Sequence, residues 1–330
     1  MNFIQLLYYG ANYGQSAFKQ LQFMKSFLQP IIHKHCIAAN YTLSEKEKKK
    51  VNFYYPLFNH IVNCENYLSI KGRKLTIEES KRLAIISAQA TLYDDLIDEE
   101  SWTKEQYYQI LYGTLPLDQQ TPKVKLFFGL LQELNEHWTP TNIYQNTLKV
   151  AIDWQIESAN QLNKNISVSE ILHISKQKCG NSSLTWAIAM DENWNEKDKA
   201  FIFQSGYVGQ MVNDFFDAYK DREDGIYTLV RKSNSIQEIA QLFKEECTKL
   251  HQLILQTNAT KTLQTKTIRQ MACIHAFGLV SLHHLQKTEK KYGIPINWEL
   301  PLRNELVTDM AFWSNKFKLL QYACAMAKWR

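Results

Sequence analysis

Residues 83–100 read LAIISAQATLYDDLIDEE, in which eleven uncharged residues precede five acidic residues crowded into the last seven positions. In a helix, Asp94 and Asp98 lie one turn apart on the same face, and Asp95 lies about 100° around the axis. Like charges at this spacing repel each other, and the C-terminal end of the helix dipole also disfavours anions. A bound cation would turn each repulsion into an attraction, so the stretch predicts a metal site at the end of an apolar helix.

A second stretch, residues 201–221, repeats this design as FIFQSGYVGQMVNDFFDAYKD. Twelve uncharged residues precede Asn213, and Asp217 and Asp221 follow it at successive four-residue steps. These three oxygen-bearing side chains line one stripe of a helix, with Lys220 beside them. Two uncharged helices that both end in oxygen ligands predict an apolar cavity with a charged rim.

The types of ligand indicate which ion such a rim would bind. Oxygen ligands without histidine or thiolate favour a hard cation such as Mg²⁺, which commonly shares its coordination between carboxylates and substrate phosphates. A diphosphate held by metal and by Lys or Arg becomes a good leaving group. Either stretch alone is also typical of a solvated helix end, but the two together, about 120 residues apart, favour a site.

The composition predicts a fold of long helices. The chain has 330 residues, of which 45% are hydrophobic, and this excludes a disordered protein. Its 11 glycines and 7 prolines are about half the usual share, too few for the many tight turns of a β-rich fold. A hydroxyl residue three positions before Glu or Gln marks a helix start at Thr76, Thr103, Ser167 and Ser235.

Apolar residues at three- and four-residue spacing predict about ten helices and one more at the C-terminus. Their ranges are 3–30, 44–70, 76–99, 103–112, 121–137, 140–163, 167–190, 196–222, 235–257, 262–291 and 302–328. The charge run SEKEKKK at 44–50 is predicted to be a solvated helix start. Length suggests about two domains, but the breaks between helices are too short for an interdomain linker. We therefore predict one α-helical domain over residues 1–330, built around a central apolar cavity.

Several classes of protein are not indicated. Six scattered cysteines without a Cys-x-x-Cys pair predict neither a zinc site nor a disulfide framework, and reduced thiols fit a cytoplasmic protein. The N-terminal MNFIQLLYYGANYGQ lacks the basic start of a signal peptide, and no uncharged apolar run reaches the roughly 18 residues of a membrane span. The net charge of +5 is spread along the chain, so no nucleic-acid surface is predicted.

With both stretches in view, the chain resembles the class I terpenoid synthase superfamily over roughly residues 75–232. Residues 94–98, DDLID, match its DDxxD motif in full. Residues 213–221, NDFFDAYKD, resemble the NDxxSxxKE motif of microbial terpene cyclases, with Asp217 in place of Ser or Thr and Asp221 in place of Glu.

The second stretch also resembles the FQxxDDxxD motif of trans-prenyl diphosphate synthases, in which Gln210, Asp214 and Asp217 match. Those chain-elongating enzymes bind isopentenyl diphosphate through an Arg-Arg pair after DDxxD and an N-terminal Gly-Lys-x-x-Arg-Pro segment. Here SWTKEQYY follows the first motif, and the N-terminal region offers only residues 71–74, KGRK. The resemblance therefore favours a one-substrate terpene synthase that ionises an allylic prenyl diphosphate and releases diphosphate with a hydrocarbon or alcohol.

The resemblance also implies roles for individual residues. Three Mg²⁺ ions would bind together with the substrate diphosphate. Their ligands would be Asp94, Asp95 and Asp98 on one side and Asn213, Asp217 and Asp221 on the other. The diphosphate oxygens would be bound by Lys178, Lys220 and Arg222. Candidates for lining the cavity, whose rings would stabilise a carbocation, are Tyr93, Trp154, Trp186, Tyr207, Phe215 and Phe216, together with Gln210.

Two alternatives stay open at this point. One is a trans-prenyl diphosphate synthase with unusual contacts to its co-substrate. The other, from a different class, is a catalytically silent helical subunit that modulates a partner synthase. This second alternative predicts eroded metal motifs, whereas each metal-ligand position here keeps an oxygen-bearing side chain. The resemblance also implies a homodimer as the usual assembly.

Overall fold

The computed structural model describes residues 1–99 and 102–329, apart from the side chains of Phe3, Asp98 and Glu99. Every regular element in these ranges is helical, so the predicted all-α fold is confirmed. None of the described helices is long and apolar enough to cross a membrane. The α-helices are α1 (Phe3–Phe23), α2 (Gln29–Ala38), α3 (Glu45–Lys49), α4 (Tyr55–Phe58), α5 (Glu65–Ser69), α6 (Ile77–Glu99), α7 (Lys104–Leu111), α8 (Pro122–His137), α9 (Asn142–Glu157), α10 (Val168–Ile188), α11 (Glu196–Phe216), α12 (Ala218–Glu223), α13 (Leu229–Lys232), α14 (Ile236–Gln256), α15 (Lys261–Tyr292), α16 (Arg303–Leu306) and α17 (Trp313–Met326).

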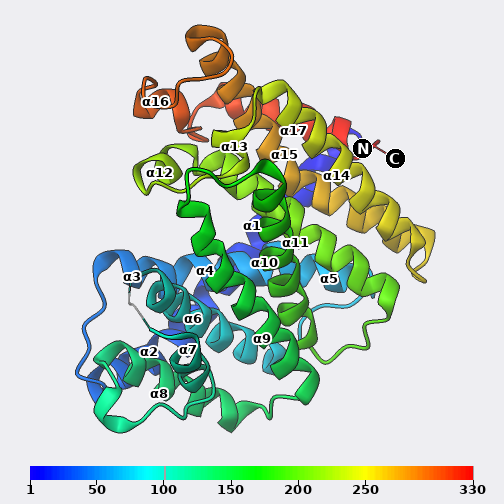
Figure 1. Cartoon of the computed structure of the whole chain (residues 1–330). Coiled ribbons are helices and arrows are strands. Elements are labelled where there is room, and N and C mark those ends of the chain that lie inside the picture. The colour runs from blue at the N-terminus through cyan, green and yellow to red at the C-terminus, as the bar shows by residue number, and fades with distance from the viewer. Residues whose placement is uncertain (100–101, 330) are drawn as a thin grey trace.

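The helix α10 lies in the middle of the array and packs most extensively against α11 and α9 (Figure 1). In turn, α11 packs against α14 and α15, and α15 packs against α17. Towards the other end of the molecule, α6 packs against α8 and α4, and it also contacts α9. The two helices that carry the acidic stretches, α6 and α11, are therefore connected through α9 and α10. Buried side chains from all these helices except α4 form one continuous hydrophobic core.

The first helix runs further than the sequence predicted. It continues past Pro30 to Ala38, because a π-helical segment, Met24–Leu28, precedes the proline. The Gln29 N–H donates to the Met24 carbonyl five residues back, in place of the usual four. The hydrogen-bond register of the helix has therefore already shifted before Pro30, which has no N–H to donate. Pro56 follows a second π-helical segment, Lys50–Tyr54, in the same way.

Two predicted helices are interrupted instead. The helix predicted over 196–222 breaks at Asp217, whose φ of −89° and ψ of 7° separate α11 from α12. The helix predicted over 302–328 is split between α16 and α17, where the buried Thr308 hydroxyl lies 3.1 Å from the Ser281 hydroxyl of α15. The four predicted caps form, since each hydroxyl accepts the backbone N–H three residues on.

The charge run at 44–50 is not fully solvated, contrary to the prediction. Glu47 is buried, where it accepts hydrogen bonds from the Tyr41 hydroxyl and the Ser44 N–H, and Lys123 Nζ lies 3.4 Å away. The Ser44 contact is a local helix cap, whereas Lys123 comes from α8, which the local sequence pattern does not connect to this run. The run therefore helps to dock α3 against α8, as well as starting a helix.

Candidate functional site

The first acidic stretch ends α6, where its carboxylates meet side chains from two other elements. Asp95 is 3% exposed, and Lys50 Nζ lies 2.6 Å from its Oδ1. Asp94 accepts hydrogen bonds from the Gln155 amide at 2.6 Å and from the Tyr55 hydroxyl at 3.4 Å. Helix α9 and the segment around α4 therefore hold the end of α6 in place.

The second acidic stretch contains a buried carboxylate, Asp214, which also has a fixed environment. Asp214 accepts a hydrogen bond from the Gln210 amide at 2.6 Å, and Gln210 accepts one from the Cys179 thiol of α10 at 2.8 Å. Burial raises the pKa of Asp214 to about 7, although the Gln210 hydrogen bond and the Lys178 charge oppose this effect. Gln210, predicted as a lining residue, thus links α10 to this stretch.

The predicted ligands of the second stretch lie close to one another. The Asn213 amide donates to Asp217 Oδ2 at 3.3 Å. Asp221 is 6% exposed, and its Oδ2 is buried with no hydrogen-bond partner among the described residues. Burial, followed by the charges of Asp214 and Asp217, raises the pKa of Asp221 to about 8. The surroundings do not neutralise the negative charge here, which is the electrostatic condition of a cation site.

Two neighbouring tyrosines connect the acidic stretches. The Tyr55 hydroxyl bonds Asp94, at the end of α6. Burial of the Tyr54 hydroxyl and the charge of Asp217, at the end of α11, raise the pKa of Tyr54. The end of α6 therefore contacts this short segment, and the charge at the end of α11 acts on it.

Cys179 is close to carboxylates of both stretches. Burial raises the pKa of its thiol to about 12; the Lys178 charge opposes this effect, and the charges of Asp214 and Asp94 add to it. Asp94 of the first stretch and Asp214 of the second therefore both lie within electrostatic range of Cys179 on α10.

The predicted diphosphate-binding lysines lie near the second stretch. Lys178 Nζ donates to the Ser158 hydroxyl at 3.3 Å, and its charge lowers the pKa of Asp214. Lys220 is exposed, with Asp224 as a distant partner at 4.0 Å. Both ammonium groups can reach anionic ligands without breaking a strong ion pair.

Arg222 is engaged in a different direction. Its guanidinium donates to the carbonyl groups of Trp298 and Pro301 at 3.2 and 2.7 Å and so holds the loop between α15 and α16. A second arginine, Arg231, was not among the predicted residues. It donates to the carbonyl groups of Asp221 and Ile226 at 3.1 and 2.7 Å, which fixes the turn after α12.

Two of the predicted cavity-lining aromatic residues pack against other helices of the core. The Tyr93 hydroxyl bonds the Tyr107 carbonyl at 2.7 Å, and its ring also packs against Phe127 of α8. Phe215 packs edge to face on Phe243 of α14, with ring centres 5.2 Å apart. These contacts account for the burial of both rings.

The remaining four aromatic candidates have separate surroundings. Trp154 packs edge to face on His173 at 5.0 Å, and Phe216 lies against Phe277 of α15 at 6.4 Å. Lys176 Nζ lies 5.7 Å from the centre of the Tyr207 ring. Trp186 is buried. The roles of these side chains toward a substrate stay predictions.

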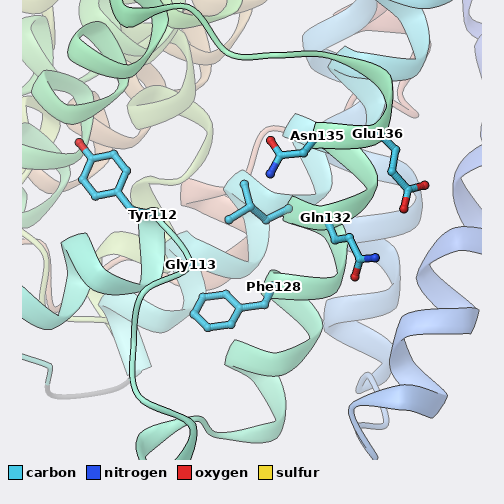
Figure 2. A pocket seen from close by; sticks show the side chains of 7 residues that line it. Tyr112, Gly113, Phe128, Gln132, Asn135 and Glu136 are labelled. Atoms are coloured by element: carbon cyan, nitrogen blue, oxygen red, sulfur yellow. The ribbon is translucent and has the colours of Figure 1, made fainter.

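Two cavities are found at other places on the molecule. One, of about 500 Å³, lies between the turn at Tyr112–Gly113 and α8, whose Phe128 is beside Gly113 (Figure 2). The other, of about 470 Å³, is lined by the segment between α9 and α10 and by the first turns of α10. Neither is lined by a residue of the acidic stretches, so the predicted central cavity stays a prediction.

The metal ligands also stay predictions. The Asp98 side chain lies outside the described residues. Among the side chains that are described, no three Asp, Glu, His or Cys residues converge into a metal-binding group. Asn213 is an amide and does not belong to these residue types.

Three contacts of the first stretch were missed by sequence reasoning: those of Lys50, Tyr55 and Gln155. Lys50 ends the charge run at 44–50, and the only available signal was that an unpaired acidic cluster needs cations somewhere in the fold.

No protein-family profile, curated protein or solved structure matches this chain.

Proposed function

We propose that this chain is a Mg²⁺-dependent terpene synthase that ionises an allylic prenyl diphosphate and releases diphosphate with a terpene hydrocarbon or alcohol. One observation carries the proposal: Asp214 of α11 is linked through Gln210 to Cys179 of α10, and the charge of Asp94, at the end of α6, also acts on this thiol. The sequence resemblance to the two metal motifs of class I terpenoid synthases supports the type of reaction.

The described residues fit the metal that this resemblance implies. The buried Asp221 Oδ2 lacks a hydrogen-bond partner among them, and burial, followed by the charges of nearby carboxylates, raises the pKa values of Asp214 and Asp221. Three Mg²⁺ ions would be held by the ligands that the sequence predicts, Asp94, Asp95 and Asp98 from the first stretch and Asn213, Asp217 and Asp221 from the second. When bound, Mg²⁺ supplies positive charge that stabilises the departing diphosphate.

The cations of the chain would bind and orient the diphosphate. Lys178 and Lys220 would donate hydrogen bonds to its oxygens, and these bonds strengthen as negative charge develops during cleavage of the C–O bond. Arg222 would have to release two backbone carbonyl groups to do the same. We therefore assign it to positioning the loop beside α12, in place of the direct diphosphate contact that the sequence suggested.

The ion pairs of Lys71 and Arg73 favour a one-substrate synthase over a chain-elongating synthase. In an elongating synthase the segment KGRK, residues 71–74, would have to bind isopentenyl diphosphate. Lys71 Nζ lies 2.8 Å from Asp198, and Arg73 makes two hydrogen bonds to the buried Glu79 and a third to Glu192. With Lys71 and Arg73 engaged, Lys74 is the one cation of this segment that stays exposed toward a second diphosphate.

The proposal is tested by incubating the chain with Mg²⁺ and geranyl, farnesyl, geranylgeranyl or longer prenyl diphosphates, each with and without isopentenyl diphosphate. We expect diphosphate release and a hydrocarbon or alcohol product whose formation does not require isopentenyl diphosphate. A longer prenyl diphosphate formed only with the co-substrate would assign the chain to the elongating synthases. No turnover, together with stimulation of a partner synthase, would assign it to the silent subunits.

Two substitutions test the metal ligands. Asp94→Asn and Asn213→Ala should each lower turnover by about a hundredfold, the usual scale for losing one preorganised electrostatic contact. The melting temperature of both variants should stay close to that of the parent chain. Asp118→Asn makes the same chemical change at an exposed carboxylate outside both stretches and should keep full turnover. Full turnover in the Asp94 and Asn213 variants would contradict the metal assignment.

A further inference from the structure

One end of the molecule exposes many large apolar side chains. It is built from the end of α15, the loop after it, α16 and the start of α17, in the upper part of Figure 1. The side chains are between 56 and 81% exposed: Ile294, Leu300, Leu302, Phe312, Trp313 and Phe317. Together with Lys287, Lys290 and Lys318 they are called the C-terminal face below.

The aromatic residues of this face belong to the half of α17 that is not packed into the core. Trp313 and Phe317 are one turn apart and share the exposed side, whereas the buried residues of α17, Ala323 and Met326, lie near its end. Lys316 Nζ lies 4.8 Å from the centre of the Trp313 ring. Exposed aromatic rings next to lysines are typical of helices that lie at a membrane surface.

Lysines without acidic partners lie on α15 and α17 at the same end of the molecule. Lys287 and Lys290 are exposed on α15, and α17 is held against α15 where the Tyr322 hydroxyl lies 3.3 Å from His283 Nδ1. Among the described residues, Lys287, Lys290 and Lys318 form no ion pair. Burial lowers the pKa of Lys318, and the nearby Lys287 charge lowers it further. This group of cations therefore lacks a counter-charge.

Two of the four acidic side chains between positions 283 and 318 are engaged elsewhere. Glu305 forms an ion pair with a lysine at the end of α15, and Glu289 is buried against a backbone N–H of α14. The other two, Glu299 and Asp309, are exposed. The other exposed cations of the same range outnumber them, so positive charge still predominates beside the apolar side chains: Lys287, Lys290, Arg303 and Lys316.

We propose that the C-terminal face binds the surface of membranes that contain anionic phospholipids. The apolar side chains would enter the boundary between headgroups and acyl chains, and the lysines would contact the anionic headgroups. The contact would lie at the surface, because no described helix is long and apolar enough to span a bilayer. A second copy of the chain is a poorer partner, since a two-fold contact would bring unpaired lysines together.

Flotation of the full chain with vesicles tests this proposal without any substrate, so its outcome is independent of the proposed enzymatic activity. We expect binding to phosphatidylcholine vesicles that contain about one-third phosphatidylserine, and little binding to phosphatidylcholine alone. High salt should weaken the binding. The triple variant Lys287→Gln/Lys290→Gln/Lys318→Gln should partition about a hundredfold less, from about fivefold for each lysine. Trp313→Ser/Phe317→Ser should lose the binding.

The helix α1 offers a matched control, because Ile4 and Leu7 are 77 and 51% exposed on a helix whose one basic residue is Lys19. The variant Ile4→Ser/Leu7→Ser should bind anionic vesicles as the parent chain does. Absence of binding, equal binding to neutral and anionic vesicles, or equal loss in the α1 variant would each overturn the proposal. It would also fail if the chain were a dimer in solution that Trp313→Ser/Phe317→Ser converts to a monomer.

Discussion

The pKa of Asp221 is raised both by burial and by negatively charged neighbours. It is 6% exposed, and Asp214 and Asp217 both add to the effect of burial on its pKa. The resulting value of about 8 is far above the ordinary value of about 4 for an aspartate. In the folded chain without metal, this carboxyl therefore keeps its proton over most of the neutral range.

The raised pKa values of Asp221 and Asp214 make the stability of the metal-free chain fall as pH rises. Up to about pH 8 the folded state binds more protons at these carboxyls than the unfolded state does. Burial lowers the pKa of His60 and His275, and this has the opposite effect below about pH 6.5. We therefore expect the melting temperature in EDTA to fall from pH 6.5 to pH 8.5, and Asp221→Asn to flatten this fall. Mg²⁺ should raise the melting temperature of the parent chain most at high pH, where the carboxylates are ionised.

An exposed carboxylate outside both acidic stretches provides the control for this experiment. Asp118→Asn should leave the pH dependence unchanged, because Asp118 is exposed. Identical slopes for the parent chain and Asp221→Asn would show that the Asp221 carboxyl is ionised at neutral pH in the folded chain, against the prediction.

At the scale of single residues, the sequence predicted the acidic residues of the site, but not the side chains that contact them. Spacing within one helix placed Asp94, Asn213 and Asp217 at helix ends, because helical periodicity is a local property. Lys50 and Gln155 come from segments 45 and 61 residues away from the carboxylates they contact, and only the packing of helices brings them there. Tertiary contacts of this kind have no local signal in a single sequence.

At the scale of elements, the close approach of α10 and α11 positions the second acidic stretch. Gly206 makes this approach possible, since a Cβ at this position would lie 2.2 Å from the Cys179 carbonyl oxygen and 2.3 Å from the Ser183 hydroxyl. Gly209, on the same helix, has no atom within 4 Å of a built Cβ. An alanine at Gly206 therefore tests the packing of α10 against α11, whereas an alanine at Gly209 tests helix propensity alone.

We expect Gly206→Ala to destabilise the chain by about 3 kcal/mol in urea unfolding, because α10 and α11 must move apart. The same shift would disturb the hydrogen bonds from Cys179 through Gln210 to Asp214 and lower turnover. Gly209→Ala should be neutral, or stabilising by up to about 1 kcal/mol, because alanine favours the helix. Equal stability of the two variants would contradict this account of the interface.

Helix positions followed from the sequence wherever a cap marked the start. The predicted 103–112 is α7 (Lys104–Leu111), and the predicted 167–190 is α10 (Val168–Ile188). The π-helical segments near Pro30 and Pro56 were not predicted, since the pattern of apolar residues carries no sign of a shifted hydrogen-bond register. The break at Asp217 was missed because the spacing of oxygen-bearing residues continues across it.

At the scale of the whole molecule, the ends of the chain meet. The helix α1 packs against α15 and α17, and the termini lie near each other in Figure 1. The Tyr13 hydroxyl donates to the Asn66 side chain at 2.7 Å and is 3.1 Å from the Gln270 carbonyl oxygen. The N-terminal, middle and C-terminal parts thus share buried contacts, which is what one cooperative domain over residues 1–330 requires.

We therefore expect one calorimetric unfolding transition, whose midpoint rises when Mg²⁺ and inorganic diphosphate are added together. Ligand at a hundred times its Kd stabilises the folded state by about 2.7 kcal/mol. With about 2.1 cal/mol/K of unfolding entropy per residue, this shifts the midpoint of a 330-residue chain by about 4 °C. Diphosphate without Mg²⁺ should have little effect, since the carboxylates at the ends of α6 and α11 repel it. Two separate transitions would contradict the single domain, and an equal shift with diphosphate alone would contradict a shared metal site.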